Sequence, residues 1–343
     1  MRELFERERA AGRPMVAAIV IATTGSTYRK PGAWMLFAQS GERAGLLSGG
    51  CLEGDLGERA ARLLASDRSL ELTSYDSRTS DDPVWGLGLG CEGLMRILLL
   101  RVDAANDWQP LAELARLESA SEDGAWSVAL RVDGAAPFAA GQVWLDDRGQ
   151  PPGIGTAPLA GVATELFVAR VTRAPRVLVC GAGPDVEPVV AWGSALGWQL
   201  TVVDHRAAYV ERTRFPAARE LRKLPAADEL ATELDLARYD AAVVMSHHLI
   251  ADGHYLAALA SAPIPYVGLL GPAARRERLF ADIGPTAAAA LRPRLRAPIG
   301  LDLGGRTPEA IALSIVAEVQ AALHGRRGEP FSSHLGTPNP EGS

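Results

Sequence analysis

Residues 176–183 read Arg-Val-Leu-Val-Cys-Gly-Ala-Gly, an apolar strand that ends in a Gly-x-Gly turn. A helical pattern follows over residues 186–196, and a second apolar strand over residues 199–203 ends at Asp204. An acidic residue about 20 positions after the first glycine occupies the ribose-binding position of dinucleotide-binding folds. The stretch therefore predicts a βαβ unit of the Rossmann type, with Gly181, Gly183 and Asp204 at its ligand-binding end.

The turn departs from the usual dinucleotide pattern at its third glycine. Val186 stands at that position, and Pro184 and Pro188 crowd the turn. The third glycine normally allows close packing between the first helix and the strand. The pattern therefore favours the fold and leaves ordinary NAD binding open.

Apolar strands continue to alternate with helical patterns after this unit, which predicts a doubly wound parallel sheet with helices on both faces. One strand over residues 239–245 is followed by His247 and His248, and another over residues 265–270 is followed by Gly271. Ligands in such sheets lie beyond the carboxyl ends of the strands. We therefore expect His247 and Gly271 to share a site with Asp204. Adjacent histidines on a strand point in opposite directions, so at most one of the pair should face the cleft.

The second informative stretch is Gly49-Gly50-Cys51, which precedes a helical pattern beginning at Leu52. Two glycines permit a sharp turn whose N–H groups can form an anion-binding concavity. A thiol at a helix N-terminus is favoured as the thiolate, a soft ligand for metal or sulfur chemistry. The competing interpretation is a buried, inert cysteine that fills a tight turn. The local pattern leaves the two interpretations about even.

Two further loops carry polar or reactive side chains. Ser26 and Arg29 follow an apolar strand over residues 15–22, where hydroxyl and guanidinium groups could hold a phosphate or a pterin edge. An ordinary surface loop is the favoured interpretation by about two to one. Cys91 lies in a second glycine-rich loop over residues 85–93, and either faces the Cys51 pocket or packs at the start of a strand.

Composition excludes several classes of protein. The net charge of −6 and pI near 5.6 argue against nucleic-acid and anionic-membrane binding. The longest apolar runs fall short of the ~20 residues that span a bilayer, and the N-terminus has no apolar signal core. Three cysteines in 343 residues do not make a disulfide framework. A soluble cytoplasmic protein is expected.

Changes in composition predict four regions. We expect an N-terminal α/β domain over residues 1–103 that carries the Gly-Gly-Cys loop. A small β-rich extension and linker should occupy residues 104–172, with a surface connection after Pro151. The Rossmann-like domain should extend over residues 173–324, before a disordered tail over residues 325–343.

Taken together, these motifs resemble those of the XdhC/CoxI family, the accessory proteins of xanthine-dehydrogenase-type molybdenum enzymes. The resemblance covers nearly the whole chain except the middle extension and the tail. It is carried by Gly25-Ser26-Thr27, Gly49-Gly50-Cys51-Leu52-Glu53, the loop over residues 88–93, Gly181-x-Gly183 through Asp204-His205-Arg206, His247-His248 with Asp252, Tyr266-Val267-Gly268-Leu269-Leu270-Gly271, and Pro298-Ile299-Gly300-Leu301 through Thr307-Pro308-Glu309.

The resemblance implies a chaperone rather than a catalyst. The expected cargo is the molybdenum cofactor, a molybdopterin whose dinucleotide form is left open, protected in its sulfurated form and delivered to an apo-molybdoenzyme. A cysteine desulfurase and a second copy of the chain, as a homodimer, are further expected partners. Cys51 is the residue carried over as the functional thiol and metal ligand. The expected cofactor-binding set is Ser26, Arg29, Gly49, Gly50, Cys51, Cys91, Gly181, Gly183, Asp204, His247 and Gly271.

Two other functions stay open on the sequence. One is an NAD(P)-dependent oxidoreductase that uses the Rossmann half, with Cys51 as a redox or nucleophilic group. The other is a dinucleotide-sensing regulatory protein without chemistry. The missing third glycine counts against the oxidoreductase, and the lack of a basic patch counts against a transcriptional regulator.

Overall fold

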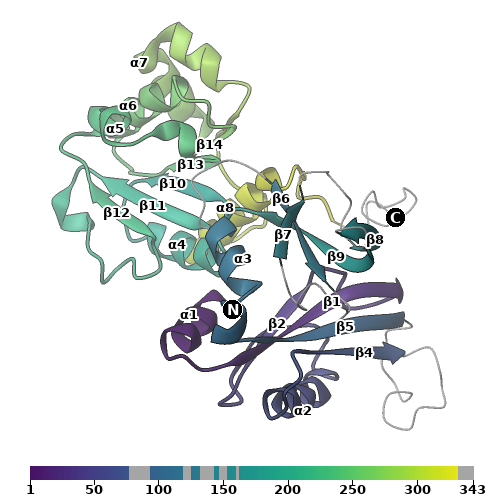
Figure 1. The fold of residues 1–343 in the computed structure, drawn as a ribbon. Coiled ribbons are helices and arrows are strands. Elements are labelled where there is room, and N and C mark those ends of the chain that lie inside the picture. The colour runs from purple at the N-terminus through teal and green to yellow at the C-terminus, as the bar shows by residue number, and fades with distance from the viewer. Residues whose placement is uncertain (77–92, 119–124, 132–142, 147–152, 160–161, 331–343) are drawn as a thin grey trace. The chain divides into compact units, whose positions relative to one another are not determined.

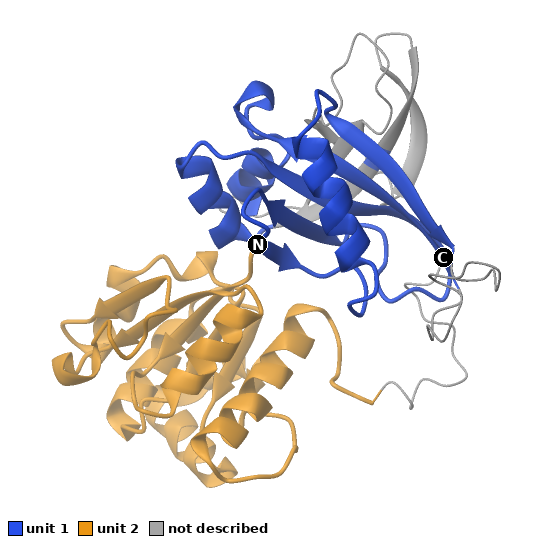
Figure 2. Cartoon of the chain, turned by 90° about the horizontal axis from the view of Figure 1, so that it is seen from below, with its two compact units in different colours: residues 1–173 blue, residues 174–343 orange. Residues whose placement is uncertain are grey.

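The computed structural model describes residues 1–76, 93–118, 125–131, 143–146, 153–159 and 162–330. The chain divides into two compact units, residues 1–173 and 174–343, which Figure 2 colours separately. Each unit has its own sheets and cores, and each is described by itself.

Unit 1 is built on a five-stranded antiparallel sheet of order β3-β2-β1-β5-β4. Its strands are β1 (Met15–Gly25), β2 (Trp34–Ala38), β3 (Arg43–Gly45), β4 (Leu70–Asp76) and β5 (Gly93–Val102).

Alternation along β1 gives this sheet two apolar faces. Met15 and Ile19 contribute to a core with α1 (Arg2–Ala10) and α3 (Leu111–Glu118). Val16 and Val20 contribute to the opposite core, beneath α2 (Glu53–Leu64). Figure 1 shows α2 alone on its side of the sheet. A strand that buries both sets of side chains must be covered by helices on both faces, which explains its nearly continuous apolar sequence.

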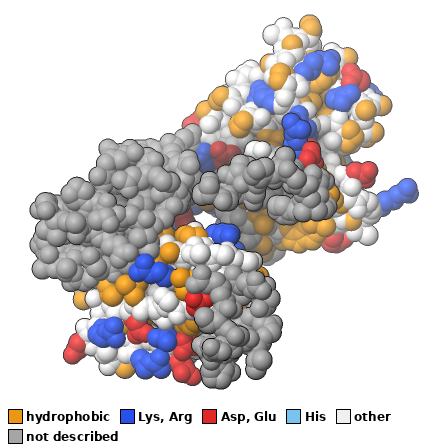
Figure 3. Space-filling model, turned by 90° about the vertical axis from the view of Figure 1, so that its right-hand side faces the viewer, with side chains coloured by type: hydrophobic (Ala, Val, Ile, Leu, Met, Phe, Trp, Pro, Cys, Tyr) orange, Lys and Arg blue, Asp and Glu red, His pale blue; other side chains and the backbone are white. Residues whose placement is uncertain are grey.

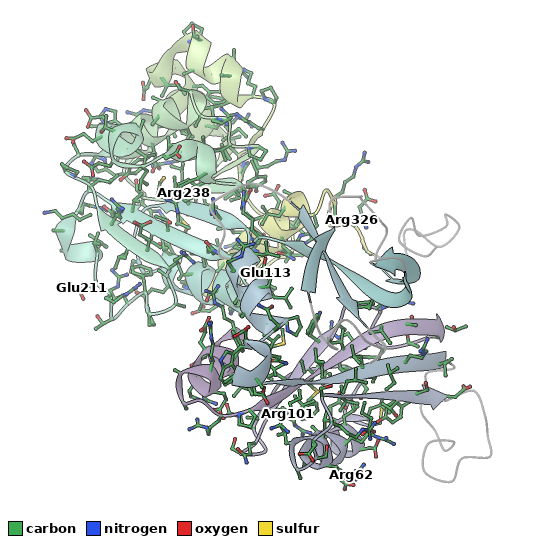
Figure 4. The ribbon with its side chains drawn as sticks, viewed as in Figure 1. Arg62, Arg101, Glu113, Glu211, Arg238 and Arg326 are labelled. Carbon is green, nitrogen blue, oxygen red and sulfur yellow. The ribbon has the colours of Figure 1, made fainter. Side chains whose placement is uncertain are left out.

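Arg101 on β5 fixes the end of α2 that lies farther from Cys51 (Figure 4). Its Nη1 atom donates to the carbonyl oxygens of Leu64 at 3.2 Å and Ser66 at 3.0 Å, and its Nε atom lies 2.6 Å from Asp103 Oδ2. A cation at the C-terminal end of a helix satisfies its free carbonyls and opposes the negative end of its dipole. The direction of α2 is therefore set by a side chain of the sheet.

Unit 1 also holds a four-stranded antiparallel sheet of order β7-β6-β9-β8. Its strands are β6 (Ala125–Arg131), β7 (Val143–Asp146), β8 (Gly153–Leu159) and β9 (Val162–Thr172). The expectation of a surface connection after Pro151 is therefore wrong, because β8 and β9 occupy residues 153–159 and 162–172. Phe167 of β9 is fully buried in the core under α1 and α3, so this sheet is anchored to the larger one.

Unit 2 is a six-stranded parallel sheet of order β12-β11-β10-β13-β14-β15. Its strands are β10 (Arg176–Cys180), β11 (Gln199–Asp204), β12 (Glu220–Lys223), β13 (Ala241–Val244), β14 (Tyr266–Leu269) and β15 (Leu295–Arg296). The first strand stands in the middle and the order reverses beside it, which is the Rossmann arrangement. The predicted α/β fold with a doubly wound parallel sheet is confirmed.

Helices cover both faces of this sheet. Side chains of α4 (Val186–Ala195) and α8 (Pro308–Leu323) form one core with the sheet. Side chains of α5 (Leu230–Glu233), α6 (Leu249–Ala260) and α7 (Ala273–Leu291) form the other. Short 3₁₀ segments complete the described elements of the chain: Ala104–Asn106, Ala207–Tyr209, Ala227–Glu229 and Leu236–Arg238.

The surface that Figure 3 presents mixes lysine and arginine with aspartate and glutamate and has no single-sign field on its described part. Within the described ranges, no helix is long and apolar enough to cross a membrane. The mixture of charges on this face agrees with the similar numbers of basic and acidic residues in the sequence.

Substitution of Gly181 tests how closely the first loop of unit 2 approaches the backbone beside it. It has φ +126°, and a Cβ atom there would lie 2.7 Å from backbone atoms of Met245 and Ser246. Gly197 also has a positive φ, +86°, but nothing lies within 4 Å of its Cβ position. We predict that Gly181→Ala lowers the free energy of unfolding by about 3 kcal/mol or more, because strain and overlap add. Gly197→Ala should cost only the strain, about 1–2 kcal/mol.

Urea unfolding of the full chain followed by tryptophan fluorescence measures both variants. Equal losses for Gly181→Ala and Gly197→Ala would contradict the close approach of Met245 and Ser246, which follow β13, to this loop.

Candidate functional site

The loop that carries Ser26 leaves the sheet of unit 1 beside the start of β5. Gly25 and Gly93 are paired residues of β1 and β5. A Cβ atom at Gly93 would lie 2.6 Å from the Ser26 carbonyl oxygen and 2.6 Å from Thr27 Cγ2. Gly93 is therefore required by the close passage of this loop.

The N-terminus of α2 lies over the same end of the sheet. Tyr75 donates its hydroxyl hydrogen bond to Asp55 in the first turn of α2. Tyr75 pairs with Met95, which in turn pairs with Thr23 near the end of β1. The structure thus brings the Cys51 loop to the end of the sheet from which the Ser26 loop departs.

Two buried residues that sequence reasoning did not assign to the site, Ser48 and Glu53, shape the Cys51 loop. The Glu53 carboxylate accepts from the Ser48 amide at 2.7 Å, from the Leu47 amide at 3.3 Å and from the Ser48 hydroxyl. The Ser48 Oγ atom in turn accepts from the amides of Gly50 at 3.3 Å and Leu52 at 3.1 Å. The loop is therefore tied to its own helix on both sides of Cys51.

Glu53 stays ionised although it is only 3% exposed. Burial by itself would raise the pKa of this carboxyl group, but the hydrogen bonds from Ser48 and the backbone outweigh burial and hold the pKa below its ordinary value. A signal for this role was present in the sequence, since Glu53 closes the Gly-Gly-Cys-Leu-Glu motif.

Cys51 itself is exposed, immediately before the N-cap residue Leu52 of α2. The interpretation of Cys51 as a buried residue is therefore wrong, and its reactivity stays a prediction. Within the part of the chain that the structure describes, nothing lies within 4 Å of the Cβ positions of Gly49, Gly50 or Gly54, so those residues leave the backbone beside the thiol open. Gly50 has φ +110°, a conformation that favours glycine. The loop thus presents a sulfur atom on an unobstructed surface.

Ser26 and Arg29 are also exposed at this end of unit 1. The Thr27 hydroxyl donates to the Arg29 carbonyl oxygen at 2.9 Å and holds the turn, and the Arg29 guanidinium lies 5.7 Å from the Tyr28 ring centroid. Both side chains are accessible, and their binding to a cofactor stays a prediction. Cys91 lies outside the described residues.

In unit 2, Asp204 ends β11 beside the glycine turn but is fully enclosed, with 0% of its side chain exposed. Its carboxylate accepts from the Ala182 amide at 2.9 Å, from the Arg206 amide at 2.8 Å and from the Arg206 guanidinium at 2.7 and 3.0 Å. Burial acts to raise the pKa of Asp204, but these hydrogen bonds hold it below the ordinary value. In this arrangement the carboxylate supports the turn and leaves no oxygen for a ribose.

His247 and Asp185 meet over the same turn. His247 has φ +59°, a strained value for a residue other than glycine, and its Nε2 atom lies 2.7 Å from Asp185 Oδ2. Asp185 Oδ1 lies only 2.6 Å from the position of a Cβ atom at Gly183. The adjacent His248 does something else, since its Nδ1 atom accepts from the Ala251 amide and caps α6. Sequence reasoning named His247 and missed Asp185.

A second buried carboxylate, Asp252 in the first turn of α6, lies against Ser246, which follows β13. Asp252 accepts from the Ser246 hydroxyl at 2.5 Å and from Arg275 at 2.6 Å. The Cδ atom of Arg275 lies only 2.6 Å from the position that a Cβ atom at Gly271 would occupy, so a side chain at Gly271 would overlap Arg275. Cys180 is buried beneath these groups, and burial, together with the charges of Asp252 and Asp204, raises the pKa of its thiol.

The described residues hold no group of three or more histidine, cysteine, aspartate or glutamate side chains that could bind a metal ion. Cys51 is therefore a lone protein thiol in the described part of its loop.

We predict that Asp204→Asn destabilises the chain, because the substitution leaves Arg206 without its buried counter-charge. The expected loss at pH 7 is about 2–4 kcal/mol in the free energy of unfolding. Since the folded-state pKa is lowered, the contribution of Asp204 is complete above its unfolded value near 4 and disappears as the pH falls through the folded value. Urea unfolding at pH 7 and below pH 4 should show a penalty that shrinks in acid. A loss of stability that is independent of pH would contradict the pairing of ionised Asp204 with Arg206.

Comparison with known proteins finds a matching family profile in each of the two units. A profile described as the XdhC and CoxI family matches residues 8–76, and one described as the XdhC Rossmann domain matches residues 177–319. A crystal structure described as a xanthine dehydrogenase from Bacillus halodurans is similar, with a TM-score of 0.73 and 29% identity over 96% of this chain and 98% of that one.

Two curated relatives match nearly the full length. The chain is 25% identical over 320 residues to the molybdenum cofactor insertion chaperone PaoD of Escherichia coli (strain K12), covering 92% of this chain and 85% of that protein. It is 32% identical over 322 residues to a probable xanthine dehydrogenase subunit of Bacillus subtilis (strain 168), covering 89% of this chain and 92% of that protein. The resemblance seen in the motifs is confirmed, and the chain belongs to the XdhC and CoxI family.

Proposed function

We propose that this protein is an accessory factor that binds the molybdenum cofactor at the Cys51 loop and delivers it to an apo-molybdoenzyme of the xanthine dehydrogenase type. The observation that carries the proposal is the exposed Cys51 thiol, held at the start of α2 beside an open stretch of backbone. The names of two relatives support it, one a molybdenum cofactor insertion chaperone and the other a probable xanthine dehydrogenase subunit.

The chemistry of the loop fits this cargo. A thiolate is a soft ligand of the kind that suits a sulfur-rich metal centre. The N-terminus of α2 carries the positive end of the helix dipole, which favours an anionic group such as the phosphate of a molybdopterin. A cargo that already carries its own pterin sulfur ligands needs only one thiol from the protein, in agreement with the single cysteine described in this loop.

An exposed site suits transfer more than storage. Cys51, Ser26 and Arg29 are all accessible at one end of unit 1, so a large receiving enzyme could approach them. We include in the proposal the protection of the sulfurated cofactor, with a cysteine desulfurase as the source of sulfur. We further propose a cytoplasmic homodimer and leave the cargo either as molybdopterin or as its dinucleotide.

The alternative, an NAD(P)-dependent oxidoreductase, is disfavoured by three features of the glycine turn in unit 2. The Ala182 amide, a donor that a pyrophosphate would use, is taken by Asp204. The Asp204 carboxylate, the usual ribose acceptor, is enclosed by Arg206. The Asp185 carboxylate stands against Gly183, where it would repel a pyrophosphate.

Molybdenum content tests the role of Cys51. We predict that Cys51→Ser, purified from a molybdenum-replete host, has a molybdenum content about one tenth of that of the wild-type protein or below. The reason is that a hydroxyl replaces the soft ligand. Cys180→Ala is the matched control, since it removes a buried thiol of unit 2 and should leave molybdenum bound. Elemental analysis gives the metal, and mass spectrometry of the released pterin identifies the cargo.

The same samples are assayed for activation of an apo-molybdoenzyme. If Cys51→Ser loads that enzyme at the wild-type rate and with wild-type molybdenum content, the proposed role of the thiol is wrong.

Titration with NADH, followed by its fluorescence, tests the alternative. We predict weak binding to the wild-type chain, with a Kd of about 1 mM or more. Asp185→Asn should bind NADH several-fold more tightly, because one charge that repels the pyrophosphate is removed. Asp282→Asn, which neutralises an exposed carboxylate on α7, is the control and should change nothing. Micromolar binding by the wild-type chain that Asp185→Asn leaves unaltered would favour the oxidoreductase.

A further inference from the structure

Glu53 occupies an unusual position for an acidic residue at the start of a helix. An acidic side chain in a first turn usually stabilises the helix by facing its free amides or the solvent. Glu53 is instead 3% exposed and is directed back into the loop that precedes α2. The N-cap residue Leu52 makes no side-chain hydrogen bond, so the helix begins without an ordinary cap.

The direction of each proton follows from the groups present. An ionised carboxylate can only accept, so the Ser48 hydroxyl donates its one proton to Glu53. The lone pairs of Ser48 Oγ are then free to accept from the amides of Gly50 and Leu52, which it does. Those two residues flank Cys51 in the sequence.

This chain of hydrogen bonds constrains the thiol from both sides. The amides before and after Cys51 are turned inward to Ser48, while Cys51 itself is exposed. Gly50 has φ +110° and no described atom within 4 Å of its Cβ position, so it would otherwise be free to adopt many conformations. Without the link, the entropy of a two-glycine turn would favour a disordered thiol.

We propose that Glu53 is the positioning residue for the Cys51 thiol and that it acts through Ser48. The inference rests on the proposed role of Cys51 in binding the cofactor. Glu53 does not touch the cargo, and its function is to set the hydrogen-bonding direction of Ser48 so that the two amides hold the turn. The pair Ser48 and Glu53 would then determine how much of the protein is ready to receive a cofactor.

Three variants separate this role from simple packing. Glu53→Gln keeps the size of the side chain but presents an NH₂ group, which occupies a lone pair of Ser48 Oγ that an amide of the loop now uses. Ser48→Ala removes the hydroxyl that links Glu53 to the amides of the loop. Ser48→Thr keeps a hydroxyl and should restore these hydrogen bonds. Glu58→Gln changes an exposed glutamate of the same helix, with 76% of its side chain accessible, and is the matched control.

Hydrogen exchange of the full chain at neutral pH reports on the loop directly. We expect the Gly50 and Leu52 amides to be protected in the wild-type protein, in Ser48→Thr and in Glu58→Gln. In Ser48→Ala and Glu53→Gln their exchange should be about tenfold faster or more, because each variant removes an acceptor from at least one of them.

Alkylation of Cys51 by iodoacetamide, quantified by peptide mass spectrometry, reports on the thiol. In Ser48→Ala and Glu53→Gln we expect the Cys51 thiol to react at about one third of the wild-type rate or below. The reason is that a freed turn samples conformations in which the sulfur is less accessible. Thermal unfolding of each variant shows that the fold is kept. If Glu53→Gln does not fold, Ser48→Ala compared with Ser48→Thr provides the same test.

Wild-type alkylation and amide exchange in both Ser48→Ala and Glu53→Gln would overturn the proposal. Neither measurement involves molybdenum, so its outcome is independent of whether Cys51 binds the cofactor. Loss of molybdenum in Cys51→Ser together with unchanged loop dynamics in Glu53→Gln would leave the proposed function standing and remove Glu53 from it.

Discussion

A carboxylate removed from water must find hydrogen-bond donors, and this requirement organises both units of the protein. In unit 1 the donors for Glu53 come from Leu47 and Ser48, residues of the loop that carries Cys51. The cost of burying the charge is offset only when the loop adopts the conformation in which those donors converge. The position of the Cys51 thiol is therefore a consequence of satisfying the charge of Glu53, two residues further along the chain.

Unit 2 uses the same principle with a different result. Asp204 at the end of β11 and Asp252 in the first turn of α6 are both buried, and each is paired with an arginine, Arg206 or Arg275. Here the donors that satisfy the carboxylates include the Ala182 amide of the glycine turn. The groups that a Rossmann domain usually offers to a dinucleotide are thus used to hold the domain together.

Periodicity predicted the sheet of unit 2 and the helix after Cys51 because both depend on local patterns. Apolar strands such as Val177–Val179 are followed by helical stretches, and handedness then leaves few ways to order parallel strands. The strands β8 and β9 were not predicted because Gly153 and Pro158 are typical of turns. Their pairing with each other is a tertiary contact that composition does not encode.

The site was predicted less completely for a related reason. Cys51 and the glycines beside it were identified because their chemistry and conformational freedom can be recognised from residue type. Glu53 was quoted in the Gly-Gly-Cys-Leu-Glu motif without a role in the site, and Asp185 was missed, because a carboxylate looks the same in sequence whether it faces water, a loop or a histidine. Only burial and distance separate those cases, as in the 2.7 Å contact between Asp185 and the strained His247.

The contrast between the two glycine turns bears on where chemistry can occur. Around Cys51, no atom of the described residues lies within 4 Å of the Cβ positions of Gly49, Gly50 and Gly54, so a ligand can approach this backbone without overlap with those residues. At Gly181 and Gly183 the corresponding positions lie within 2.7 Å of backbone or carboxylate atoms. A ligand for the second turn must therefore displace Asp185 and break its contact with His247, whereas a ligand for the first meets a preorganised surface. Binding energy is spent on rearrangement only at the Rossmann turn, which makes the Cys51 loop the better placed of the two to accept a cargo and to release it.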